Sequence, residues 1–182
     1  GSSGPGHVHL INGLYDAHRS GAPVLALAST MATEEFGSRY FQETDTIKLF
    51  DDCSYYNQVA ATPAQLPRML QAAMQTALSR HGVAVVGIPG DVTAKDSVDI
   101  FSSLHPFPTQ PSIRPSDKEL DELSALLNNK TKITLFCGMG AKDAHAEVVE
   151  LSHRLNAPVA YSFKSKMEIQ YDNPNEVGMT GL

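Results

Sequence analysis

Basic residues are few in this chain, and they are scattered along it. Fourteen lysines and arginines stand against twenty aspartates and glutamates among 182 residues, and the formal net charge is -6. Proteins that bind nucleic acid need clustered lysine and arginine side chains for their phosphate contacts. The composition therefore argues against a nucleic-acid-binding function.

Cysteine and long apolar runs are also scarce. Cys53 and Cys137 lie far apart and form no CxxC pair, which indicates two reduced, buried thiols. No apolar run approaches the roughly 20 residues that cross a bilayer, and no signal-peptide pattern is visible. The seven histidines have no spacing that suits one metal ion. No metal ligand is therefore assigned. No nucleophile-elbow pattern supports a catalytic triad, so no catalytic residue is assigned either.

The chain does contain alternating apolar runs and amphipathic segments. The runs PVLALA at 23–28 and VAVVGI at 83–88 are typical of strands buried on both faces of a parallel sheet. Apolar periodicity and capping residues predict the remaining elements. Further strands are expected at 55–60, 133–137 and 158–163, and helices at 7–18, 45–53, 62–81, 116–127 and 143–156, with no closing element in 171–182.

Four prolines between 106 and 115 interrupt this alternation. With serine and threonine between them, they are typical of a linker, and we assign residues 93–115 to it. Strands alternate with helices on both sides, so the predicted fold class is α/β with two incomplete parallel-sheet units. The expected units are residues 1–92 and 116–182.

Three short segments are candidates for contact with a ligand. Gly138-Met139-Gly140 follows an expected strand and precedes a helix, where a backbone turn can approach a phosphate or a flavin; it also suits an ordinary tight turn. Gly4-Pro5-Gly6 is a similar glycine turn. Phe41-Gln42 lies in the loop after the first buried strand, where open α/β sheets bind ligands. The alternative is a buried phenylalanine beside an exposed glutamine.

Taken together, these segments resemble one enzyme family. The matching runs are GSSGPGHVHLINGLYDAHRSGAPVLALAS, GSRYFQET, HGVAVVGIPGDV, TLFCGMGAKDAHAEVVELSHRLNAPV and YDNPNEVGMTGL, which span almost the whole chain in order. They are similar to the thiamine-diphosphate-dependent pyruvate oxidase family, which includes the quinone-dependent pyruvate dehydrogenases. The resemblance implies that residues 1–92 are the C-terminal part of a pyrimidine-binding domain. Residues 116–182 would be the N-terminal part of an FAD-binding, Rossmann-like middle domain.

The resemblance also implies roles for individual residues. Phe41 and Gln42 would line the substrate pocket. The cofactor-binding residues would lie in two groups: Gly4, Pro5 and Gly6 near the pyrimidine end of thiamine diphosphate, and Gly138, Gly140, Thr180, Gly181 and Leu182 against FAD. The family's activating glutamate and its diphosphate and Mg²⁺ motif have no counterpart in this sequence. We therefore expect the 182 residues alone to be inactive.

The implied reaction is the decarboxylation of pyruvate with thiamine diphosphate, Mg²⁺ and FAD, and quinone or oxygen as the electron acceptor. The implied assembly is a homo-oligomer, a dimer of dimers in the full-length enzyme. The implied location is the cytoplasm, including a peripheral position at the inner face of the membrane. Two alternatives stay open: an acetolactate synthase-type carboligase, which shares the FQE loop and binds FAD, and a non-catalytic α/β binding or scaffold domain.

Overall fold

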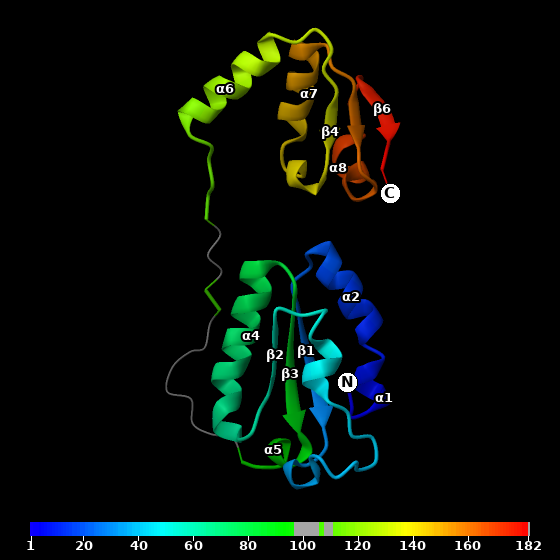
Figure 1. The fold of residues 1–182 in the computed structure, drawn as a ribbon, viewed down its shortest axis with the longest axis vertical. Coiled ribbons are helices and arrows are strands. Elements are labelled where there is room, and N and C mark those ends of the chain that lie inside the picture. Colours follow the sequence, from blue (N-terminus) through cyan, green and yellow to red (C-terminus); the bar gives the residue numbers. More distant parts are fainter. Residues whose placement is uncertain (97–105, 108–110, 182) are drawn as a thin grey trace. The chain divides into compact units, whose positions relative to one another are not determined.

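The computed structural model describes residues 1–96, 106–107 and 111–181, and they form two compact units. The first unit spans Gly1–Ser112 and the second Ile113–Leu182. Each unit contains one three-stranded sheet in which all strands are parallel, as Figure 1 shows. The predicted fold class, two α/β units with parallel sheets, is therefore confirmed.

The sheet of the first unit is built from the two predicted apolar runs and one shorter strand. Strands β1 (Val24–Thr30) and β2 (Tyr56–Val59) both pair with the central strand β3 (Val83–Pro89). The central strand is buried at nearly every position, because helices cover both of its faces. All three strands run in one direction, so their carboxyl ends meet at the same edge of the sheet.

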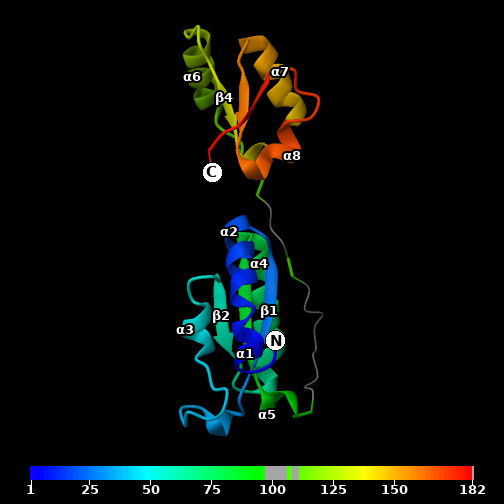
Figure 2. The same ribbon diagram turned by 90° about the vertical axis from the view of Figure 1, so that its right-hand side faces the viewer.

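Two hydrophobic clusters place the helices on opposite faces of this sheet (Figure 2). On one face, α2 (Ile11–Ser20) and α3 (Thr46–Phe50) pack onto β1 and β3 through Leu14 and Phe50. On the other face, α4 (Leu66–Arg80) packs onto β3 through Ala73 and Ala77. The small alanines let the helix come close to the sheet. The shorter elements are α1 (Pro5–Val8), η1 (Thr33–Glu35), η2 (Pro63–Gln65) and α5 (Gly90–Thr93).

The second unit has a smaller core around strand β5. The sheet order is β4 (Leu135–Cys137), β5 (Val159–Tyr161) and β6 (Glu176–Met179). Buried Val159 and Ile169 lie at its centre. The helices are α6 (Asp117–Asn128), η3 (Met139–Ala141), α7 (His145–Leu155), η4 (Phe163–Ser165) and α8 (Lys166–Ile169). The predicted capping box is present, since Ser116 and Glu119 satisfy each other's backbone N–H groups at the start of α6.

Two local predictions were wrong. The helix expected at 7–18 is two helices, because the turn of α1 ends at Val8 and α2 begins at Ile11. The tail does contain a closing strand, since β6 pairs with β5 across a register shift between Val159 and Ala160. This strand contains Gly178, at φ 105°, and glycine is uncommon in strands, so the sequence of the segment does not indicate one.

About half of the proposed linker at 93–115 lies outside the described residues. Residues 97–105 and 108–110 are not described, so its linker character stays a prediction. In the part of the chain that the structure covers, no helix has the length and apolarity needed to cross a membrane.

Candidate functional site

The loop between β1 and α3 lies at the carboxyl edge of the first sheet and carries both predicted substrate residues. It follows Thr30, the last residue of β1, and reaches Asp45, the N-cap of α3. In an open parallel sheet this edge is where ligands bind. Residues 37–44 of this stretch, the GSRYFQET segment, are called the substrate loop below, after the role that the resemblance implies for Phe41 and Gln42.

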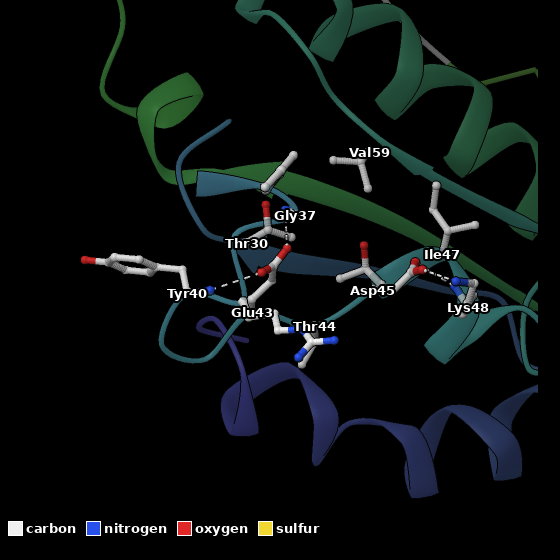
Figure 3. A pocket seen from close by; sticks show the side chains of 12 residues that line it. Thr30, Gly37, Tyr40, Glu43, Thr44, Asp45, Ile47, Lys48 and Val59 are labelled. Atoms are coloured by element: carbon white, nitrogen blue, oxygen red, sulfur yellow. Dashed lines mark hydrogen bonds and ion pairs between the residues drawn. The ribbon is translucent and has the colours of Figure 1, made fainter. Parts of the chain in front are cut away.

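A cavity of about 850 Å³ lies beside the substrate loop (Figure 3). Its walls include the last residues of two strands, Thr30 of β1 and Val59 of β2. Charged and uncharged side chains from the loop and from α3 form the rest of the lining. The full set is Thr30, Phe36, Gly37, Arg39, Tyr40, Glu43, Thr44, Asp45, Thr46, Ile47, Lys48 and Val59. The volume suits a small-molecule ligand.

Glu43 holds the substrate loop together from inside. Its carboxylate oxygens accept hydrogen bonds from the backbone N–H of Gly37 at 2.6 Å and of Tyr40 at 3.1 Å, the dashed lines in Figure 3. Two residues of the loop, Arg39 at φ 60° and Gln42 at φ 64°, have the left-handed conformation that non-glycine residues rarely adopt. Such a conformation persists only where the surroundings fix it, and it is concentrated at functional sites.

Two carboxylates fix the segments on either side of the loop. Asp91, which follows β3, accepts hydrogen bonds from Thr33 through its backbone N–H at 2.8 Å and its hydroxyl at 2.9 Å. The backbone N–H of Thr33 is the first cause that holds the pKa of Asp91 below its ordinary value. At the other end, Asp45 caps α3 by accepting from the backbone N–H of Lys48 at 3.1 Å, which lowers the pKa of Asp45.

The structure brings the predicted glycine turn against the predicted substrate residues. Gly4 is the N-cap of α1 with φ 60°, and a Cβ built on it would lie 2.6 Å from Cβ of Gln42. The hydroxyl of Ser3 donates to Oε1 of Gln42 at 3.4 Å. Pro5 and Gly6 form the first turn of α1. The turn at 4–6 and the loop at 37–44, far apart in sequence, are therefore in direct contact.

Phe41 and Gln42 are at the surface and do not line the cavity. Phe41 is 76% exposed, which removes the alternative of a phenylalanine buried in the core. The cavity is lined instead by their neighbours Tyr40 and Glu43. Gln42 thus faces the glycine turn, and Phe41 is exposed beside it in the loop.

The predicted flavin residues gather at the carboxyl edge of the second sheet. Gly138 directly follows β4, and Thr180 directly follows β6. The backbone N–H of Thr180 donates to the carbonyl of Tyr161 at 3.0 Å, which ties this end to β5. A Cβ on Gly181 would lie 3.8 Å from Cζ of Phe136. Leu182, assigned to the same group, lies outside the described residues.

The two glycines of the GMG turn leave open space at this edge. A Cβ built on Gly138 or on Gly140 would meet nothing within 4 Å among the described residues. Packing against the described residues therefore does not require a glycine at either position. Such a turn is compatible with a flavin or a phosphate that approaches the backbone closely.

The described residues contain no group of three or more histidine, cysteine, aspartate or glutamate side chains that could hold a metal ion. Both cysteines are buried and unpaired, and burial raises the pKa of the thiols of Cys53 and Cys137. Reactive cysteines have a lowered pKa instead. These two therefore have the properties of core residues.

Several residues that shape the site were not predicted from the sequence. The buried His7 and Asp91 act through partners distant in sequence, so no local pattern indicates their roles. Glu43 acts within its own loop. Glu43 alone carried a signal, because it stands beside Phe41-Gln42 in the segment singled out by resemblance.

Part of the chain matches a known protein family. Residues 120–182 match the model of the thiamine pyrophosphate enzyme central domain. The matched segment lies within the second unit and includes all of its strands. Its mixed α/β architecture, with a three-stranded parallel sheet, is consistent with that domain.

Similar curated proteins match most or all of the chain. The uncharacterized 42.6 kDa protein in the isoamylase 3′ region of Pseudomonas amyloderamosa is 46% identical over all of this chain and 46% of its own length. The pyruvate oxidase of Lactiplantibacillus plantarum is 33% identical over 91% of this chain and 28% of its own length. The acetolactate synthase of Arthrospira platensis is 29% identical over all of this chain and 32% of its own length. The chain thus spans less than half the length of these relatives.

Proposed function

We propose that this relative of thiamine pyrophosphate enzymes is part of a flavoenzyme that oxidatively decarboxylates pyruvate, with quinone or oxygen as the acceptor. The observation that carries the proposal is the contact between the turn at Gly4 and the loop residue Gln42 at the carboxyl edge of a parallel sheet. The similarity to a pyruvate oxidase across 91% of the chain supports the same reaction.

This chain would contribute part of the binding sites for the cofactors that this reaction requires. Gly4, Pro5 and Gly6 would lie near the pyrimidine end of thiamine diphosphate, and Gly138, Gly140, Thr180, Gly181 and Leu182 against FAD. When bound, these cofactors would supply the electron sink for decarboxylation and the acceptor for the released electrons, together with Mg²⁺ for the diphosphate. The chain itself would supply binding and orientation.

The substrate loop would position a small 2-oxo acid. The amide of Gln42 accepts from the Ser3 hydroxyl through its oxygen, and its nitrogen remains a donor for a carbonyl or carboxylate oxygen of the substrate. The exposed ring of Phe41 would cover the apolar side of the substrate and exclude water. The guanidinium of Arg39, which lines the adjacent cavity, would pair with the carboxylate of the substrate.

An acetolactate synthase-type carboligase is the second candidate. It is supported by the relative from Arthrospira platensis, whose similarity covers all of this chain. Both reactions begin by decarboxylating pyruvate, and they differ in the fate of the remaining two-carbon unit. The carboligase joins it to a second 2-oxo acid, and the oxidase passes its electrons to FAD.

Product analysis of the complete protein distinguishes the two. With pyruvate, thiamine diphosphate, Mg²⁺ and FAD, the oxidase produces acetate or an activated acetyl product and reduces a dye acceptor in proportion to carbon dioxide release. Formation of acetolactate without dye reduction would establish the carboligase. Absence of carbon dioxide release, with both cofactors shown to be bound, would contradict both and favour the non-catalytic binding domain.

The assembly and location of the complete protein belong to the same proposal. We propose a homo-oligomer, a dimer of dimers, in the cytoplasm, and light scattering of the purified complete protein tests the oligomeric state. A monomer that is active with pyruvate would refute the assembly and leave the reaction in place.

A further inference from the structure

His7 is a fully buried histidine that none of the roles above uses. It lies in α1, three residues after Gly4, and its side chain has no solvent exposure. Its Nδ1 lies 2.8 Å from the carbonyl oxygen of Ser29, and its Nε2 lies 2.5 Å from Oγ1 of Thr44. A buried polar ring with both nitrogens paired is held in one orientation.

The partners of His7 fix its tautomer, and its burial favours the neutral form. The carbonyl of Ser29 can only accept, so Nδ1 carries the hydrogen. Burial is the largest of the causes that lower the pKa of His7, which favours the neutral ring. In the neutral ring Nε2 is an acceptor, and the hydroxyl of Thr44 donates to it.

The ring joins three segments that meet at the site. Ser29 lies near the carboxyl end of β1, and Thr44 is the last residue of the substrate loop. The ring of Phe50, in α3, packs edge-on against His7 with centroids 5.9 Å apart. His7 therefore connects the glycine turn and β1 to the end of the loop that carries Gln42.

The substrate loop needs such an anchor. Arg39 and Gln42 both hold left-handed conformations, which are unfavourable for a non-glycine residue unless the surroundings fix them. Glu43 fixes the loop internally through Gly37 and Tyr40. Those bonds close the loop on itself without attaching it to the body of the unit. The hydrogen bond to His7 provides an attachment to α1, two residues after Gln42.

We propose that His7 is a positioning residue that acts through Thr44 to hold Gln42 against the turn at Gly4. The expected effect of His7 on the binding of pyruvate rests on the proposed function. The attachment of the loop through Thr44 does not depend on that function. Binding of His7 to substrate is no part of the proposal, because its ring is buried and both nitrogens are occupied.

Two variants of the complete protein test the attachment. Thr44→Val removes the hydroxyl and keeps the shape of the side chain. His7→Asn keeps a donor for Ser29 and is too short to reach Thr44. His81→Asn is the matched control, because His81 is an exposed histidine that precedes β3 at the opposite edge of the sheet and Asn tolerates its left-handed backbone.

Hydrogen exchange of peptides from 36–45 is the first measurement, made without pyruvate. Both variants are expected to exchange about three- to tenfold faster in this segment, the factor given by loss of one hydrogen bond. Peptides of α4 and the His81→Asn protein should be unchanged. The double variant should be no faster than either single variant, because both remove the same bond.

Kinetics with pyruvate is the second measurement. KM should rise by a similar factor in both single variants, with the affinity for FAD unchanged. Unaltered hydrogen exchange of residues 36–45 in Thr44→Val would overturn the proposal. If His7→Asn fails to fold, the Thr44→Val protein alone tests the attachment. Faster exchange in a protein that does not turn over pyruvate would support the attachment while refuting the proposed function.

Discussion

Gly4 and Gln42 are in contact at a distance that leaves no room for a side chain on Gly4. A Cβ at Gly4 would lie 2.6 Å from Cβ of Gln42, and Gly4 also has φ 60°. Both residues were assigned to the site on grounds of sequence, one to the cofactor and the other to the substrate. Their contact connects the two assignments, since a shift of the turn would also move the loop.

Replacing Gly4 with alanine should therefore disturb the substrate loop. We expect Gly4→Ala to lower the free energy of unfolding by about 1–3 kcal/mol, through the left-handed backbone and the clash with Gln42. Chemical denaturation measures this loss. Gly13→Ala is the matched control, because Gly13 lies in α2 with nothing within 4 Å of an added Cβ, and alanine there should stabilise the helix. Equal stability of the Gly4→Ala protein and the wild type would contradict the contact.

The bond between Asp91 and Thr33 predicts a dependence of stability on acid. The pKa of Asp91 is lowered in the folded chain, so the unfolded chain binds the proton more readily. The stabilisation is present above the ordinary pKa of about 3.9 and is lost as the pH falls through the lower, folded value. Asp91→Asn should remove this part of the acid sensitivity.

Denaturation curves between pH 2 and pH 6 test this prediction, with roughly pH 4 as the start of the expected loss. Asp16→Asn, an exposed carboxylate on α2, is the control. An Asp91→Asn protein that keeps the wild-type dependence on pH would show that the bond to Thr33 does not stabilise the fold.

The open space at Gly140 predicts a defect specific to flavin. Because a Cβ there meets none of the described residues within 4 Å, Gly140→Val should leave thermal unfolding of the cofactor-free complete protein nearly unchanged. A valine would still block close approach of a flavin to the backbone, so the FAD content of the purified protein should fall. Normal FAD occupancy would remove Gly138 and Gly140 from the proposed flavin site.

The sequence predicted the elements whose signals are local. The strands at 24–30 and 83–89 follow from apolar runs, and the cap at Ser116 follows from the glutamate three residues later. The short strand β6 was missed because it has only four residues and one of them is Gly178, a residue type that is uncommon in strands. Its pairing with β5 is also irregular. A strand of four residues with such a break has little periodicity to detect.

The site was predictable only in part, for a similar reason. Resemblance indicated the glycine turn and the Phe41-Gln42 loop, and each is placed at the carboxyl edge of the sheet. The partners of His7 are 22 and 37 residues away, and Thr33 is 58 residues away from Asp91. Contacts of this range come from the fold as a whole, and no spacing within one segment reveals them.

The steady-state kinetics of Gln42→Ala in the complete protein test the central claim most directly. We expect kcat/KM for pyruvate to fall roughly tenfold or more, as loss of a substrate hydrogen bond worth about 1.4 kcal/mol requires, with FAD content unchanged. Gln58→Ala is the control, because Gln58 is an exposed residue of β2 outside the cavity beside the substrate loop. Wild-type kcat/KM in the Gln42→Ala protein would contradict the claim that this loop binds the substrate.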